Sequence, residues 1–311
     1  MNKAFFSAAV LAVLTTMSFA ATSAPVGKIY GKINISLVNT DSGSEDVWKL
    51  NSNASRIGLK GSTKVSEGLE VFYKTEFEVA VDDGSFDNKT SGDDTDKVTF
   101  KQRNIFAGIK GNFGSVLAGK SDTPTKQAQK KIDLFGDLEG DIKKTFAGEN
   151  RMSNIVAYST PVFGAFAAAY AVMPSEENNG GLSDAKSYSV SYNKEGLYVA
   201  VAADSNVNDT DLLRLVSQYK FDAWQLGLMY QENDTTDESG YFTSAAYKAN
   251  HMTYKAQYGS NKNDTDGSEK TTLSLGADYK LSKNTKTFVF YTDNEGSSST
   301  KIFGLGLEHK F

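Results

Sequence analysis

The alternation of apolar and polar residues at every second position is the feature that most constrains how this chain can fold. In the segment FGLGLEHKF, residues Phe303, Leu305, Leu307, His309 and Phe311 fall on one face, while glycine, glutamate and lysine fall on the other. A period of two with one apolar face predicts a half-apolar β-strand. Because an unpaired apolar edge would invite aggregation, we expect this strand to be paired on both sides, as in a closed barrel.

Segments with the same period follow one another along almost the whole chain. The predicted strands are Val26–Val38, Trp48–Gly61, Leu69–Val79, Lys97–Gly111, Gly114–Ser121, Arg151–Thr160, Gly164–Met173, Ala185–Asn193, Leu197–Asp204, Asp211–Phe221, Ala223–Glu232, Gly240–Lys248, His251–Asn261, Lys270–Leu281, Thr285–Thr292 and Ser299–Phe311. They number sixteen, with boundaries good to about two to four residues. Short turns alternate with longer loops rich in Asp, Asn, Ser and Gly, which is typical of antiparallel up-and-down barrels.

The polar face of these strands decides between a soluble and a membrane-spanning barrel. Sixteen strands enclose a lumen too wide for side chains to fill, so a barrel of that size holds water. The polar face is also too highly charged for a core, since it includes Lys32, Arg56, Lys60, Lys74, Glu76, Arg214, Gln218 and Lys255. We therefore predict an all-β fold, a transmembrane 16-stranded antiparallel up-and-down β-barrel whose apolar face meets lipid. A multi-domain β-sandwich protein is the alternative.

The first twenty residues have the pattern of a secretory signal peptide. Lys3 precedes an apolar run from Ala4 to Leu14, and small residues then lead to Ala20. The run is shorter than the about 20 apolar residues that a helix needs to cross a bilayer. We expect residues 1–20 to be removed on export and residues 21–311 to form the barrel; a buried N-terminal helix is the alternative. Loss of Lys3 takes the formal charge from −5 to −6.

The composition argues against an enzyme. The chain has no cysteine and two histidines, of which His251 lies at a predicted turn and His309 on the outward face of a strand. Neither histidine is placed to activate a nucleophile. No cofactor and no metal ion are expected: the segment Asp264–Gly267 fails the calcium-loop pattern, because Lys262 and Leu273 occupy its first and last positions. The mild acidity argues against a nucleic-acid partner.

Three stretches of the chain resemble the general diffusion porins of Gram-negative outer membranes. These stretches are SRIGLKG at 55–61, RNIFAGIKGNFGSVLAGK at 103–120 and the segment FGLGLEHKF at 303–311. The resemblance implies a homotrimer in the bacterial outer membrane, in contact with lipid and lipopolysaccharide. It also implies passive diffusion of small hydrophilic solutes and ions through each barrel, past a third long loop that folds inward.

The same resemblance implies a set of site residues. By position, the inward-folded loop corresponds to Asp122–Asn150. The acidic residues of the implied constriction are Asp133, Asp137, Glu139 and Asp141, and the basic residues of the facing wall are Arg56, Lys74, Arg103 and Arg151. Arg103 falls in phase with Ile105 on the lipid side, so either a β-bulge turns it inward or it lies at the rim. Ordinary solvated carboxylates are the alternative interpretation of the acidic residues.

The function that these patterns predict is an outer-membrane pore for passive diffusion. Opposing charges across the constriction would orient water and favour small hydrophilic molecules over apolar ones. The charge of −6 and the acid-rich loops predict weak cation selectivity. The alternatives are a substrate-specific channel, which requires a track of lumenal aromatic residues, and a barrel that serves as an adhesin or structural anchor.

Overall fold

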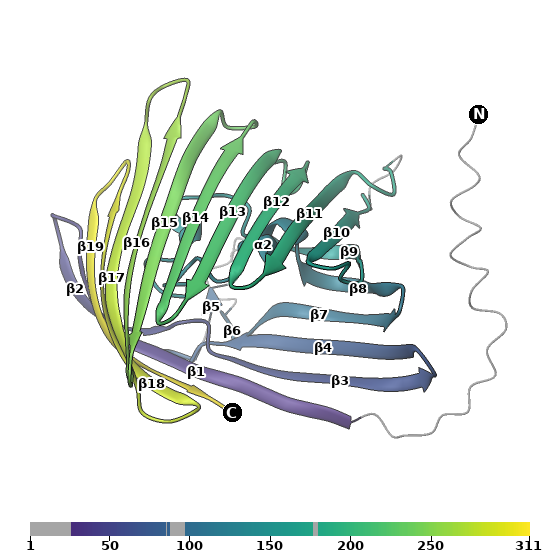
Figure 1. Cartoon of the computed structure of the whole chain (residues 1–311). Coiled ribbons are helices and arrows are strands. Elements are labelled where there is room, and N and C mark those ends of the chain that lie inside the picture. The colour runs from purple at the N-terminus through teal and green to yellow at the C-terminus, as the bar shows by residue number, and fades with distance from the viewer. Residues whose placement is uncertain (1–25, 85, 88–96, 177–179) are drawn as a thin grey trace.

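The computed structural model describes residues 26–84, 86–87, 97–176 and 180–311 (Figure 1). The predicted signal peptide, residues 1–20, and part of the connection 80–96 between two predicted strands lie outside the described residues. In the described part of the chain, no helix is both long enough and apolar enough to cross a bilayer.

The described residues are mostly strands. The strands are β1 (Val26–Asp41), β2 (Asp46–Ser52), β3 (Arg56–Ser66), β4 (Leu69–Val79), β5 (Phe86–Asp87), β6 (Lys97–Val98), β7 (Phe100–Gly111), β8 (Gly114–Asp122), β9 (Arg151–Ser159), β10 (Phe166–Met173), β11 (Ala185–Lys194), β12 (Leu197–Ser205), β13 (Leu212–Phe221), β14 (Trp224–Asn233), β15 (Glu238–Ala249), β16 (Met252–Asn263), β17 (Glu269–Lys280), β18 (Thr285–Glu295) and β19 (Thr300–Lys310). Two short helices, α2 (Pro124–Ala128) and the 3₁₀-helix η1 (Ile142–Lys144), lie between β8 and β9. Strands β5 and β6 form a separate two-stranded hairpin.

Antiparallel pairing closes the other strands into a barrel. Successive strands pair with one another, except that β2 and β3 both pair with β1 and that β4 pairs with β7, and β1 pairs with β19 in the register Lys32 to Lys310 through Asp41 to Lys301. Closure removes the free edges that would otherwise template aggregation. The prediction of a closed antiparallel barrel is therefore confirmed.

Strands β2 and β3 lie end to end and together take the place of one of the sixteen strands of the barrel wall. Both pair with β1, β2 along residues 35–41 and β3 along residues 26–32. Between them Ala54 has a left-handed φ of 48°, and the side chains of Asn53 and Ser55 bond to β1. The prediction of one continuous strand over Trp48–Gly61 was wrong, because hydrogen bonds from these side chains replace the backbone ladder with β1 at the point where β2 ends and β3 begins.

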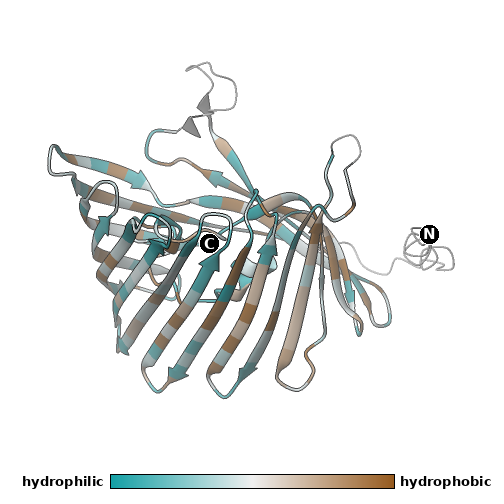
Figure 2. Ribbon diagram, turned by 90° about the horizontal axis from the view of Figure 1, so that it is seen from above, coloured by the Kyte–Doolittle hydropathy of each residue, from teal (hydrophilic) through white to brown (hydrophobic). Residues whose placement is uncertain are grey.

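The burial pattern is inverted relative to a soluble protein. Large apolar residues are exposed on the outer face, for example Ile29 at 67% and Leu305 at 55%, whereas Arg214, at 0%, is among the most buried side chains. Figure 2 shows hydrophobic and hydrophilic residues alternating along the strands. Because lipid surrounds the outside and water fills the inside of a large barrel, this inversion is the arrangement that a membrane-spanning barrel requires.

The two ends of the barrel differ in their connections. At the end that carries the starts of β1, β4 and β8, strands are joined by turns such as Glu195–Gly196, whose φ angles of 51° and 83° suit a tight hairpin. We call this end the short-turn rim. The longer connections, such as 206–211 and 264–268, lie at the opposite end, which we call the long-loop rim.

Candidate functional site

The segment 123–150 between β8 and β9 is the longest described connection, and it packs against the polar inner faces of other strands. Its first turn is α2, where Pro124 opens the helix and Thr123 caps it by accepting a hydrogen bond from the Lys126 backbone N–H. Thr125 is buried and bonds to Ser187 of β11 through its backbone N–H and its hydroxyl, each at 3.1 Å. These contacts fix the start of the segment beside β11 and β12 (Figure 1).

Two apolar clusters hold the middle of the segment. Ile132, Ile142 and Phe146 pack with inward residues of β12 to β15, including Tyr198 and Phe242. Phe135 packs in a second cluster with Val38, Phe288, Phe290 and Ile302 of β1, β18 and β19. Two glycines of β19 leave room for these aromatic rings. A Cβ at Gly304 would overlap the ring of Phe290, and a Cβ at Gly306 would overlap that of Phe288. The segment therefore has a core of its own inside a polar wall.

Polar contacts complete this attachment. The Gln257 amide of β16 accepts from the Leu134 N–H at 2.9 Å and donates to the Gly140 carbonyl at 2.5 Å. Near the end of the segment, the buried Arg214 guanidinium of β13 donates to the Ala147 carbonyl and to the Glu149 carboxylate, both at 2.7 Å. Burial raises the pKa of Glu149, and the Arg214 charge opposes this rise.

Asp137 forms the contact between the segment and the basic wall. Its carboxylate accepts from the Lys32 ammonium at 2.8 Å and from the Arg56 guanidinium at 2.5 Å. Burial alone would raise the pKa of Asp137, but the charges of Lys32 and Arg56 and the hydrogen bond from Lys32 outweigh it and lower the pKa to about 2. Asp137 also has a left-handed φ of 70°. The segment thus bridges from β16 and β18 to β1 and β3.

Basic and acidic side chains alternate on the wall beside this contact. The Glu76 carboxylate accepts from Arg103 at 3.0 Å and from the Tyr30 hydroxyl at 2.8 Å, and it pairs with the Lys74 ammonium at 3.2 Å. Arg103 also donates to Glu78 at 2.6 Å. The structure therefore brings Arg56, Lys74 and Arg103 together and places the carboxylates Glu76 and Glu78 between them.

A β-bulge turns Arg103 inward. In the β4–β7 pairing, Thr75 lies opposite Ile105 but Phe77 lies opposite Gln102, so β7 contains one extra residue at this point. The extra residue moves the side chains that precede Ile105 in β7 to the opposite face from the one that strict alternation predicts. Of the two positions expected for Arg103, the structure has the bulge.

Arg151 belongs to a neighbouring part of the wall. Its guanidinium bonds to Asp122 at 2.9 Å and to the Asn104 side chain at 3.1 Å. Asp122 also pairs with Lys126 at 3.3 Å, so the two ends of the segment share one ion-pair cluster. Arg151 therefore lines the base of the segment and not the contact that Asp137 makes at its tip.

The other three predicted acidic residues have different surroundings. Asp133 accepts hydrogen bonds from the backbone N–H groups of Phe135 and Ile142, and Asp141 accepts from those of Asp137 and Lys143. Burial, and after it the charge of Asp141, raises the pKa of Asp133. Both carboxylates therefore organise the segment's own backbone.

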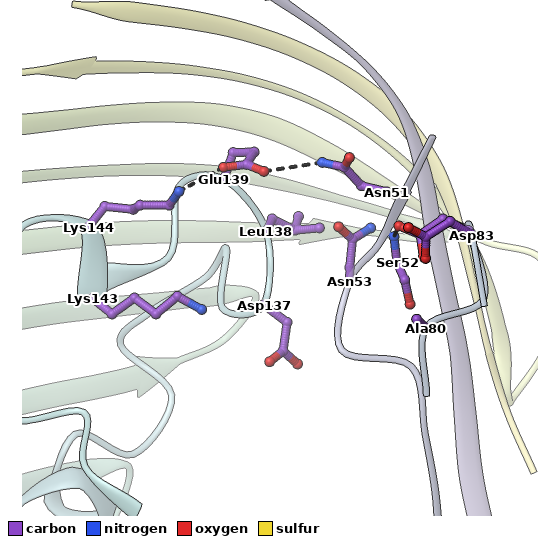
Figure 3. Close-up of a pocket in the computed structure, with 11 residues that line it drawn as sticks. Asn51, Ser52, Asn53, Ala80, Asp83, Asp137, Leu138, Glu139, Lys143 and Lys144 are labelled. Carbon is purple, nitrogen blue, oxygen red and sulfur yellow. Dashed lines mark hydrogen bonds and ion pairs between the residues drawn. The ribbon is translucent and has the colours of Figure 1, made fainter. Parts of the chain in front are cut away.

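Glu139 faces open space at the tip of the segment. It bonds to Asn51 at 3.2 Å and to the Lys144 ammonium at 2.9 Å (Figure 3). It lines a cavity of about 330 Å³ that is also bordered by Asp82 and Lys143. Glu139 and Asp137 are thus the two predicted acidic residues at the lumenal surface of the segment.

Lys32 and Glu76 are the principal members of the site that the predicted residue set lacks. Both were placed on the polar face by the period-two pattern, but no local signal marks which polar-face residue meets the segment. In the described part of the chain, no group of three or more His, Asp or Glu side chains is arranged to hold a metal ion.

Comparison with known proteins agrees with this geometry. A family model described as Gram-negative porin matches residues 7–299. The chain belongs to this family. The outer membrane porin protein 32 of Delftia acidovorans is 26% identical over 347 residues, which cover 100% of this chain and 93% of that protein.

Solved structures show the same fold. An anion-selective porin from Comamonas acidovorans superposes with a TM-score of 0.76 at 20% identity, covering 93% of this chain and 100% of that one. The trimer form of OmpT from Vibrio cholerae superposes with a TM-score of 0.67 at 17% identity, covering 93% and 100%. This porin is therefore a diffusion channel of the bacterial outer membrane and not an enzyme.

Proposed function

We propose that residues 123–150 form the constriction of this diffusion channel, with Asp137 joined to Lys32 and Arg56 of the wall and with Glu139, Lys74 and Arg103 beside this contact. The observation that supports this proposal best is the bridge from Gln257 through Asp137 to Lys32 and Arg56, which joins the inner face of β16 to those of β1 and β3 across the intervening strands β17 to β19. A segment held in this way narrows the lumen, so solutes must pass through the charged space that remains beside it. Fixed charges at such a gap favour hydrophilic solutes.

The charges along the lumen favour anions. Among the described residues, the ion pairs of the segment and the facing wall contain eight cations, Lys32, Arg56, Lys74, Arg103, Lys126, Lys143, Lys144 and Arg151, and seven carboxylates, Glu76, Glu78, Asp122, Asp137, Glu139, Asp141 and Glu308. The acidic surplus of the chain lies instead near the long-loop rim, for example at Asp41, Glu45, Asp46, Asp234, Asp237, Asp264 and Asp266. Because ion preference follows the sign of charge in the narrow part of a pore, we propose weak anion preference, opposite to the expectation from total charge.

A general pore fits the lumen better than a substrate-specific channel. A sugar-specific channel requires a track of stacked aromatic side chains, whereas the inward pair Phe72–Phe106 meets edge to face at 6.1 Å. We also propose that the mature protein is a homotrimer in lipid and lipopolysaccharide, formed after removal of residues 1–20. The trimer form known for OmpT supports this assembly.

A cysteine scan at two positions tests the constriction. The natural chain has no cysteine, so each introduced thiol is unique. Lys143→Cys lies on the segment beside the cavity at Glu139, and Leu305→Cys lies on the exposed apolar face of β19. A bulky membrane-impermeant thiol reagent should reduce the current of the first variant and leave the second unchanged. An unchanged current in labelled Lys143→Cys would contradict the proposal.

Swelling of liposomes in sugars of increasing size separates the two channel types. A smooth decline of rate with solute size supports a general pore. A rate that saturates with the concentration of one sugar would support a substrate-specific channel instead.

A further inference from the structure

A basic pocket lies at the short-turn rim, away from the constriction. Its cavity has a volume of about 300 Å³, and the ends of β15 to β19 surround it. Five lysines line it, namely Lys248, Lys280, Lys283, Lys286 and Lys310, against two carboxylates. The formal surplus is therefore three positive charges, in a chain whose total charge is negative. We call this cavity the lysine pocket.

The two carboxylates of the lysine pocket are already neutralised. Asp278 pairs with Lys255 and Lys286, each at 2.8 Å. Glu308 pairs with Lys310 at 3.0 Å and with Lys32 at 3.6 Å. These ion pairs leave three lysines of the pocket, Lys248, Lys280 and Lys283, with no carboxylate partner among the described residues.

The strand register adds like-charge repulsion. Lys280 lies directly opposite Lys286 in the β17–β18 ladder, and like charges at such positions are destabilising. A multivalent anion that binds between the lysines would relieve this repulsion. The pocket also offers neutral hydrogen-bonding groups, the hydroxyls of Ser282 and Thr285. At about 30 Å³ per water molecule, its volume accommodates a phosphate-sized anion with part of its hydration shell.

We propose that the lysine pocket is a binding site for small multivalent oxyanions at the short-turn mouth of the channel. Because short turns of outer-membrane barrels face the periplasm, the site collects such anions from that side. The three lysines without a carboxylate partner, Lys248, Lys280 and Lys283, belong to the rim and not to the constriction, so this proposal can be tested separately from the function proposed for residues 123–150. A concave site with one sign of charge concentrates its counter-ions and makes block by them one-sided.

Tripolyphosphate added to one side of a planar bilayer tests this proposal on the full mature chain. We expect it to reduce the KCl current at a concentration about tenfold lower from the short-turn side than from the other side. A single thiol at Ser297→Cys in a long loop, labelled with a membrane-impermeant reagent, identifies the sides. The chain has no other thiol to react.

The matched variants carry the same change of charge at opposite rims. Lys248→Gln/Lys280→Gln/Lys283→Gln should weaken the block from the short-turn side about tenfold or more, to the level seen from the other side. Lys49→Gln/Lys262→Gln/Lys301→Gln removes three exposed lysines near the long loops and should leave the block unchanged. Calorimetric titration of the detergent-purified proteins with tripolyphosphate should show the same loss of affinity without reference to current.

Three results would overturn the proposal. The first is block of equal strength from both sides. The second is block and calorimetric affinity that survive in the short-turn triple variant, and the third is block and affinity that fall equally in both triple variants. A normal open-channel conductance in each variant confirms that the barrel has folded.

Discussion

The contact of Asp137 with the wall yields the sharpest prediction about the constriction. Asp137→Asn keeps the size of the side chain but removes the charge that Lys32 and Arg56 hold. The pKa of Asp137 falls from an ordinary 3.8 to about 2, and at about 1.4 kcal/mol per pKa unit this difference corresponds to about 2 kcal/mol. The Asp137 side chain is 28% exposed, so solvent screening removes little of this energy.

Detachment of the segment tip from the wall should therefore become more frequent. A loss of about 2 kcal/mol increases the detached population roughly thirtyfold. Single-channel recordings at neutral pH should show this as excess current fluctuation in the open state. Asp209→Asn provides the matched control, because Asp209 is exposed in the connection between β12 and β13. Its current fluctuation should equal that of the natural protein.

A double variant separates the contact from a general effect of charge. Lys32→Met alone should produce similar fluctuation, and Asp137→Asn/Lys32→Met should add less than the sum of the two, because both remove one shared interaction. Current fluctuation in Asp137→Asn no greater than in Asp209→Asn, or two single effects that are fully additive, would refute this role of the Asp137 contact.

Three further predictions concern the attachment of the same segment. Because the pKa of Asp137 is depressed, the stabilisation that its charge provides is present above about pH 4 and is lost as pH falls toward 2. The current fluctuation of the natural channel should therefore increase over that range, while that of Asp137→Asn changes less. Arg214→Met leaves the buried Glu149 carboxylate without its cation and should lower the free energy of unfolding in urea by about 3–5 kcal/mol. Adding Glu149→Gln to this variant should restore part of the loss. Gly140→Ala places a Cβ against the Ser274 hydroxyl and should cost about 1–3 kcal/mol in the same assay, and no loss there would contradict the close approach.

The barrel could be predicted from the sequence because its cause is local. The period-two alternation in each strand decides which face meets lipid, and pairing to neighbours in sequence follows from short turns. The break at Ala54 could not be predicted in this way. It depends on Asn53 and Ser55 bonding to the adjacent strand, a contact that no local periodicity encodes.

The proposed constriction was predictable only in part, because its contacts join residues that are far apart in sequence. The Asp137 carboxylate lies 105 residues from Lys32, and the Leu134 N–H lies 123 residues from the Gln257 amide. Nothing in the order of the chain reveals which acidic side chain makes such a contact and which, like Asp141, caps a turn of the backbone. Arg103 was ambiguous for a related reason, since one extra residue in β7 reverses its direction.

The distinction between total charge and lumenal charge is the central claim of this account, and the reversal potential tests it most directly. The measurement requires the purified mature protein in a planar bilayer that separates two KCl concentrations. We predict a reversal potential displaced toward the chloride equilibrium potential, because the charged wall at Lys32 and Arg56 and the lysine pocket line the path of the ions. A displacement toward the potassium equilibrium potential, in line with the net negative charge of the chain, would contradict the account.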